Sequence, residues 1–226
     1  GLDHLEINGE TISIGAKVRH AAFHRPVIDS PLGQMLTTVV RHIAHVPIRT
    51  RGTFCGSLAH ADPASEWCLV AATLDARMIA RSTRGERALA PNEFFQGIMT
   101  TALKPDELLA EVRLPMLPSD TNFGFEEFSR RVGDFAIGMA LVTYRIADGV
   151  MVEPRIGVGG AEEFPRRLIG AEAALEGQTP GTAAFKAAAD AAAEAVDPMT
   201  DINTSAQYRR DLVRTLTHRA LERAAA

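Results

Sequence analysis

Apolar and polar residues alternate in the first part of the chain, from Leu5 to Ile14, on both sides of Asn8-Gly9. An Asn-Gly pair supplies the positive φ angles of a type I′ turn, so this stretch predicts a β-hairpin. From Leu32 to Ile43 the apolar residues recur at three- and four-residue spacing, directly after Ser30-Pro31. This spacing predicts an amphipathic helix that begins at Ser30-Pro31 and ends before Pro47.

The middle of the chain alternates between helical spacing and short β-rich runs. Asp62-Pro63 combines a good N-cap with a residue that fits the first helical position, and it predicts a helix over residues 64–74. Two strands, at 76–81 and 87–89, are expected on either side of a turn at 82–86. A short helical segment is expected at 91–97, and a strand that a proline stops at 110–115.

A linker rich in proline and polar residues is expected at about 116–122. It divides the chain into a first domain, 1–116, and a second domain, 122–226. In the second domain two apolar runs flank Asp148-Gly149, and helical patterns follow. These patterns predict a strand pair over 138–146 and 150–158, and helices near 168–176, 182–196 and 204–225.

Composition narrows the classes of function. The 226 residues carry a formal net charge of −4 and a pI near 6.0, which argues against a general nucleic-acid binder because that function needs a basic face. No apolar run reaches the length of a membrane span. The two cysteines, Cys55 and Cys68, form no disulfide framework, so we expect a reducing cytoplasm. They also cannot supply the four thiolates of an iron–sulfur cluster, so any metal chemistry is expected on another chain.

Small residues cluster in the stretch from Ile48 to Glu66, which includes Gly52, Gly56 and Ser57. A Gly/Ser/Thr loop that leads into a helix start gathers free backbone N–H groups, and such a loop can cradle a phosphate or pyrophosphate. Composition alone favours a tight turn with nothing bound, since glycine loops are common turns. The order of the residues therefore has to decide between the two interpretations.

That order closely resembles the second flavin-binding segment of the FAD-binding medium subunit of molybdenum hydroxylases, the family of carbon monoxide dehydrogenase and the xanthine dehydrogenase flavin domain. Members read approximately R-x-R-G-T-I-G-G-S-L-A-H-A-D-P-A-A-E. The matching residues here are Arg49, Arg51-Gly52-Thr53, the run from Gly56 to Ala64, and Glu66. Two further stretches are similar to family signatures: residues 94–115 and the run from Arg130 to Ala136.

The resemblance implies an α+β fold. It would be the remainder of a two-subdomain FAD-binding domain, with a mixed sheet and helices, followed by a C-terminal domain of antiparallel sheet and helices. Residues 1–116 would then be the second subdomain only. The resemblance also implies a set of FAD contacts: Thr53, Gly56, Ser57, His60 and Glu66, with Leu109 and Phe135 as further contacts and Ile43 as a weaker candidate. For Glu66 two interpretations stay open, a hydrogen bond to the FAD hydroxyls and a carboxylate that complements the helix dipole.

As a member of this family, the chain is expected to be the electron-transfer flavoprotein subunit of an oxidoreductase complex in the cytoplasm. FAD on this chain would receive electrons from a [2Fe–2S] small subunit and pass them to an external acceptor. Oxidation of the substrate would occur on a large subunit that carries the molybdenum cofactor. The resemblance implies a dimer of such heterotrimers and assigns no catalytic acid or base to this chain, because the redox chemistry belongs to the cofactor.

Two departures from the family pattern support an alternative function. Cys55 replaces the first glycine of the glycine pair, and its Cβ is expected to obstruct the backbone's approach to the phosphates. The family's other phosphate loop, A-G-G-Q-S-L, is not found, so FAD is expected to bind weakly or not at all if residues 1–226 are the whole protein. The alternative is a flavin-free scaffold subunit of the same complex. A hydrolase built on Ser57 and His60 has little support, because the sequence offers no nucleophile elbow and no third member.

Overall fold

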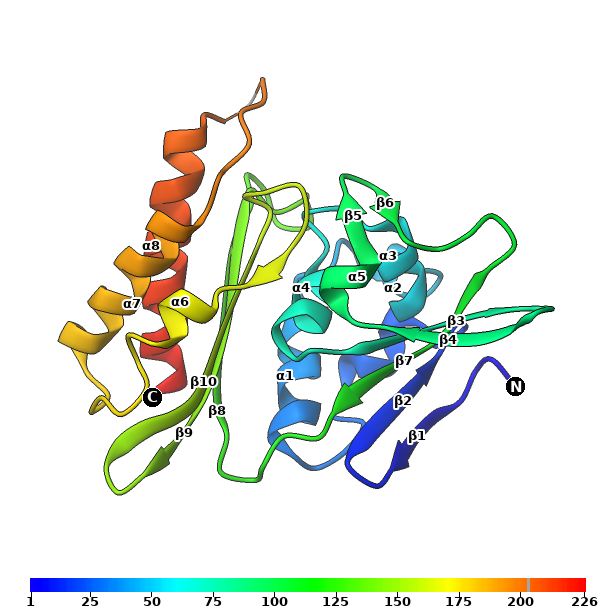
Figure 1. Ribbon diagram of the computed structural model, residues 1–226, viewed down its shortest axis with the longest axis horizontal. Helices are drawn as coiled ribbons and strands as arrows, with labels where there is room; N and C mark the ends of the chain where they lie inside the picture. Colours follow the sequence, from blue (N-terminus) through cyan, green and yellow to red (C-terminus); the bar gives the residue numbers. More distant parts are fainter. Residues whose placement is uncertain (203) are drawn as a thin grey trace.

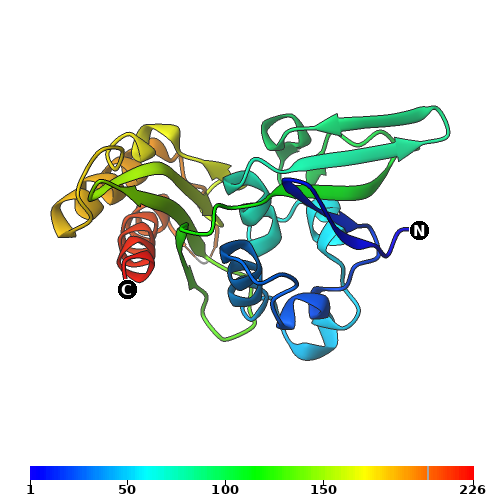
Figure 2. The same ribbon diagram turned by 90° about the horizontal axis from the view of Figure 1, so that it is seen from below.

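The computed structural model describes residues 1–202 and 204–226, which form two antiparallel sheets, a small two-stranded sheet, and helices (Figure 1). The expected α+β class is confirmed. The resemblance implies a mixed sheet in the first half, but each strand pair that the structure describes there is antiparallel. The described chain ends lie at opposite ends of the molecule in both views (Figures 1 and 2).

The first sheet has five strands. In spatial order they are β1 (Leu5–Asn8), β2 (Thr11–Gly15), β7 (Leu108–Pro115), β3 (Arg77–Ser82) and β4 (Gly85–Leu89). The predicted first hairpin is confirmed. Its turn is Gly9-Glu10 rather than Asn8-Gly9, because Asn8 already pairs with Thr11, and of the turn residues only Gly9 has a positive φ. The small sheet pairs β5 (Phe95–Gly97) with β6 (Thr100–Thr101).

Short helices pack beside this sheet. In chain order they are the 3₁₀ helix η1 (His20–His24), α1 (Pro31–Val40), α2 (Val46–Arg49), α3 (Phe54–His60), α4 (Glu66–Thr73) and α5 (Pro91–Phe94). The start of α1 is as predicted, since the Ser30 hydroxyl accepts a hydrogen bond from the Gly33 N–H at 3.2 Å. Its end comes earlier than predicted, at Val40, and Ala44 then takes a left-handed conformation with φ 39°.

The small-residue stretch differs from its prediction in two ways. Residues 54–60 form the helix α3 rather than a loop, and the Thr53 hydroxyl caps it by accepting the Gly56 N–H at 3.0 Å. The next helix, α4, begins at Glu66 rather than at Asp62. The Asp62 carboxylate instead accepts the Ala64 N–H at 2.8 Å and forms a turn between the two helices.

The second sheet has four strands, in the spatial order β11 (Arg166–Arg167), β10 (Val150–Gly159), β9 (Gly138–Ala147) and β8 (Asn122–Phe128). The predicted β9–β10 pair is confirmed, whereas β8 was not predicted, because its sequence F-G-F-E-E-F does not keep a strict alternation. Three helices follow: α6 (Ile169–Glu172), which is shorter than predicted, and α7 (Thr182–Ala195) and α8 (Ala206–Ala224), which match their predictions.

Helix α4 joins the two halves. All eight of its residues are buried, and it lies on the face of the second sheet opposite α7 and α8 (Figure 1). The backbone of β10 approaches α4 so closely that a Cβ at Gly157 would lie 1.8 Å from the Thr73 Oγ1 atom. One apolar cluster accordingly contains residues of both halves, among them Leu69 and Leu141.

In the part of the chain that the structure describes, none of the helices combines the length and the apolar character that crossing a bilayer requires.

Candidate functional site

A cavity of about 360 Å³ opens between the short helices of the first half and the loop that follows β8. Four of the seven contacts predicted from the resemblance line it, namely Ser57, His60, Glu66 and Phe135, and so does Ile43. The other lining residues are His20, Ala44, Ile48, Asp62, Ser65, Gly133 and Asp134. The lining combines apolar walls with a few polar groups, which is typical of small-molecule sites.

Three predicted contacts lie outside the lining of this cavity. Thr53 is the N-cap of α3 and Gly56 lies in its first turn, before Ser57 and His60, the two α3 residues that line the cavity. Gly56 is needed for the cap itself, because a Cβ there would lie 2.7 Å from the Thr53 Oγ1 atom. Leu109 is 2% exposed on β7, where it pairs with Ala80 in the sheet.

One wall of the cavity depends on Arg49, a residue of the family-like stretch. Its Nη1 atom donates to the backbone carbonyls of Ile43 at 2.7 Å and Ala44 at 2.9 Å, and its Nε atom donates to His24 Nε2 at 3.0 Å. These bonds hold the segment that leaves α1, including the left-handed Ala44. The arginine therefore shapes the wall from behind, a function that the sequence does not reveal.

Another part of the lining comes from the loop after β8, which contributes Gly133, Asp134 and Phe135. Gly133 has φ 86°, and a Cβ there would lie 2.3 Å from the His45 ring, so only glycine lets the loop pass at this position. Phe135, 72% exposed, stands at the mouth of the cavity. Ile48 lines the same cavity and is 54% exposed. The mouth is thus an apolar rim that is open to solvent.

Glu66 lies in the first turn of α4 and is 9% exposed. Burial raises the pKa of its carboxyl group to about 7; the Glu66 backbone N–H opposes this shift, and nearby Asp62 adds to it. Burial also raises the pKa of Glu127, on β8, to about 8, with a contribution from the charge of Glu66. The sequence gives no signal for Glu127, since two adjacent glutamates are typical of a solvated surface.

Glu127 has unusual surroundings for a carboxyl group. Its Oε2 atom is buried with no hydrogen-bond partner among the residues described, and His42 Nδ1 lies 3.7 Å away. Burial lowers the pKa of His42, although the charge of Glu126 opposes this shift. The carboxyl group of Glu127 is therefore favoured in its neutral form.

His20, on η1, is a cavity residue that the sequence does not predict. It is 3% exposed, and its Nδ1 atom accepts a hydrogen bond from Trp67 Nε1 at 2.9 Å. Burial lowers the pKa of His20 to about 4, and the charges of Arg19 and Arg49 act in the same direction. No local pattern marks this histidine, because its environment comes from α4 and from the segment before α3.

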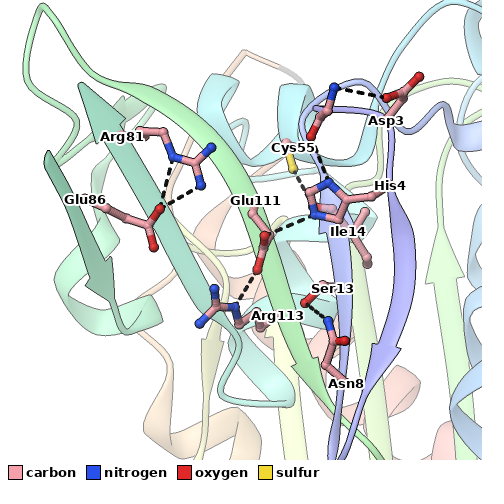
Figure 3. Close-up of polar contacts among 11 residues, drawn as sticks. Asp3, His4, Asn8, Ser13, Ile14, Cys55, Arg81, Glu86, Glu111 and Arg113 are labelled. Atoms are coloured by element: carbon pink, nitrogen blue, oxygen red, sulfur yellow. Dashed lines mark hydrogen bonds and ion pairs between the residues drawn. The ribbon is translucent and has the colours of Figure 1, made fainter. Parts of the chain in front are cut away.

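Cys55 points away from the exposed side of α3. Its side chain is buried and its Sγ atom donates to the Ile14 carbonyl at 3.4 Å (Figure 3). Burial raises the pKa of the thiol to about 12, with a further contribution from Glu111. The Cβ thus lies on the side of α3 that faces the first sheet. The Cys55 Cβ is therefore not in a position to obstruct a phosphate that approaches the exposed side of α3, contrary to the expectation from the sequence.

Comparison with protein families matches both halves of the chain. Residues 1–117 match the FAD binding domain in molybdopterin dehydrogenase, and residues 123–224 match the carbon monoxide dehydrogenase flavoprotein C-terminal domain. The nicotine 6-hydroxylase medium subunit of Paenarthrobacter nicotinovorans is 37% identical over 227 residues, which cover 100% of this chain and 79% of that protein.

Solved structures give the same match. Carbon monoxide dehydrogenase from Hydrogenophaga pseudoflava aligns with a TM-score of 0.93 and 29% identity, over 99% of this chain and 78% of that chain. Quinoline 2-oxidoreductase from Pseudomonas putida 86 aligns with a TM-score of 0.91 and 33% identity, with the same coverage.

Proposed function

This chain belongs to the family of FAD-binding medium subunits of molybdenum hydroxylases, and from that premise we propose that it passes electrons from an iron–sulfur subunit to an external acceptor. The observation that supports the proposal best is the cavity, which gathers family-like residues from three separate parts of the chain. Ile43 follows α1, Ser57 lies on α3, and Phe135 comes from the loop after β8.

The donor set and shape of the cavity fit a flavin. Ligand pockets in proteins occupy roughly 300–1,000 Å³, so a cavity of about 360 Å³ suits one part of FAD rather than the whole dinucleotide. Its apolar residues suit an aromatic ring system, and its hydroxyl and carboxyl groups suit the hydroxyls of a ribityl chain. Glu66 can donate as well as accept a hydrogen bond when it is protonated, which its raised pKa of about 7 favours below neutral pH.

Each proposed contact has a definite task toward the cofactor. Ser57, His60 and Glu66 would bind its polar groups, and Ile43 and Phe135 would shield the ring from water. When bound, FAD supplies the redox chemistry, and the protein supplies binding and orientation. Thr53 and Gly56 would serve the phosphate part through the start of α3, and Leu109, on the sheet, would lie against the adenine–ribityl part.

The proposal extends to the assembly. The small subunit would carry [2Fe–2S] and the large subunit the molybdenum cofactor, where the substrate is oxidised, and two such heterotrimers would pair in the cytoplasm. The two free, buried cysteines agree with a reducing compartment. Within this chain we propose 1–116 as the FAD-binding part and 122–226 as the C-terminal domain.

The visible absorption spectrum of the complex, purified with its native partners, tests this function. We expect a flavin spectrum, with FAD released on denaturation and reduction of the flavin when the substrate of the complex is added. A colourless chain in an otherwise assembled complex would contradict the proposal and support the flavin-free scaffold function.

A further inference from the structure

His20 is a polar side chain that is almost fully buried and yet lines the cavity. Its Nδ1 atom is occupied, because the Trp67 Nε1–H donates to it at 2.9 Å. An indole nitrogen can only donate, so Nδ1 must be the unprotonated nitrogen of the imidazole. The neutral ring therefore carries its proton on Nε2.

Neutrality of the ring follows from its surroundings. Burial, together with Arg19 and Arg49, lowers the pKa of His20 to about 4, so the imidazole carries no charge at neutral pH. Among the described residues, the one hydrogen bond of the imidazole ring is that at Nδ1, and Nε2 is not one of the fully buried polar atoms that lack a partner. An N–H donor without a protein partner normally meets a ligand or water.

The ring is also held firmly in place. Trp67 packs against Phe23 and Phe54, with ring centroids 5.2 and 4.8 Å apart. The His20 backbone N–H donates to the Gly52 carbonyl at 3.1 Å. A Cβ on Gly52 would lie 2.5 Å from His20 Nε2, so glycine at this position leaves room for the imidazole.

From this geometry we propose that His20 is a hydrogen-bond donor of the flavin site, with its Nε2–H directed at an acceptor atom on the flavin ring or ribityl chain. The assignment rests on the proposed function. The acceptor is placed on the flavin part rather than on the phosphates because the phosphate-side residues Thr53 and Gly56 do not line this cavity. Trp67 is then a positioning residue, which acts by fixing the tautomer of His20.

Nuclear magnetic resonance of the full chain labelled with ¹⁵N-histidine tests the assignment directly. We expect His20 to show the Nε2–H tautomer without FAD, and its signals to shift when either riboflavin or FAD is added. An Nδ1–H tautomer would overturn the proposal. A shift with FAD but none with riboflavin would also overturn it, because the acceptor would then lie on the phosphates.

Affinity measurements on the complex with its native partners give an independent test. Loss of one neutral hydrogen bond should weaken FAD binding about tenfold in His20→Phe, and His20→Gln, which keeps a donor, should recover part of the loss. In Trp67→Phe the tautomer should no longer be fixed, and the histidine spectrum should show both forms. His218→Phe, on α8 and outside the cavity, is the matched control and should bind FAD as the wild type does.

The two proposals can fail separately. A wild-type complex that contains flavin, together with a folded His20→Phe variant of unchanged FAD affinity, would overturn the assignment of His20 alone. A wild-type complex without flavin would overturn the proposed function and this assignment with it. Circular dichroism and the thermal midpoint of His20→Phe decide whether the variant is folded.

Discussion

Glu127 shows how burial changes a single residue. Its side chain is 4% exposed and its pKa is raised to about 8, so the folded protein binds a proton that the unfolded chain releases near pH 4.5. A group whose pKa is raised on folding stabilises the fold fully below the unfolded pKa. The stabilisation is lost as the pH rises through the folded pKa.

We therefore predict that Glu127→Gln removes a pH dependence of stability. Between about pH 4.5 and pH 8 the wild type should lose on the order of 4 kcal/mol relative to the variant, because only the wild type has to bury a charge. Urea unfolding at pH 5 and pH 8.5 measures the difference. Glu10→Gln, at the exposed turn of the first hairpin, is the control, and parallel profiles for wild type and Glu127→Gln would contradict the prediction.

Cys55 provides a second test at the residue scale. Because its side chain faces the core, Cys55→Gly should leave FAD affinity unchanged and lower the free energy of unfolding by about 2 kcal/mol, through a lost buried side chain and a more flexible helix. Cys55→Ala should cost less, since it keeps the Cβ. Tighter FAD binding in the glycine variant, but not in the alanine variant, would show that the Cβ does obstruct the cofactor.

At the scale of elements, α3 carries three of the proposed FAD contacts, Gly56, Ser57 and His60, on a helix of only seven residues. Such a short helix depends strongly on its ends, since few of its N–H groups have partners within the helix. The Thr53 cap at its start is therefore more important than it would be in a long helix. The left-handed Ala61 ends the helix and turns the chain toward Asp62.

Removal of the cap should affect both stability and binding. Thr53→Val keeps the shape of the side chain but loses the hydrogen bond to the Gly56 N–H, so we expect a loss of about 1 kcal/mol in unfolding free energy and weaker FAD binding. Thr53→Ser keeps the acceptor and should stay close to wild type. Equal losses in the two variants, measured by thermal unfolding and FAD titration, would show that the methyl group matters rather than the cap.

At the scale of the whole molecule, α4 is buried on all sides and packs against β9 and β10 of the second sheet. It also carries Glu66, which lines the cavity, and Trp67, which fixes His20. The site in the first half therefore depends on packing against the second half. Ion pairs of Asp75, directly after α4, with Arg155 and Arg167 tie the halves together at the edge of this contact.

Gly157→Ala tests this dependence. Its Cβ would meet the Thr73 Oγ1 atom at 1.8 Å, and we expect overpacking to lower the free energy of unfolding by about 3 kcal/mol and to weaken FAD binding as α4 shifts. Gly170→Ala, on α6, is the matched control, because nothing lies within 4 Å of its Cβ, and it should be neutral or slightly stabilising. Unfolding curves and FAD affinities of the two variants measure the effect, and similar behaviour would contradict the close contact.

The sequence alone was sufficient for elements with a strong local pattern. The first hairpin, the start of α1, the β9–β10 pair and the helices α7 and α8 follow from alternation, capping and helical spacing, which act between near neighbours in the chain. The residue order in the stretch from Arg49 to Glu66 was specific enough to identify the family. The C-terminal end of α1 and the division between α3 and α4 were predicted wrongly, because several good caps compete there and tertiary contacts choose among them.

Only the tertiary structure decided which of the candidate residues line the cavity. It brings Ile43, Ser57 and Phe135 to one cavity although they are far apart in the chain, and it leaves Leu109 in the sheet. It also lowers the pKa of His20 and raises the pKa of Glu127, in both cases chiefly through burial. The physical reason is that solvation and the partner of a polar atom depend on elements packed together in space, and no local pattern of residues records that packing.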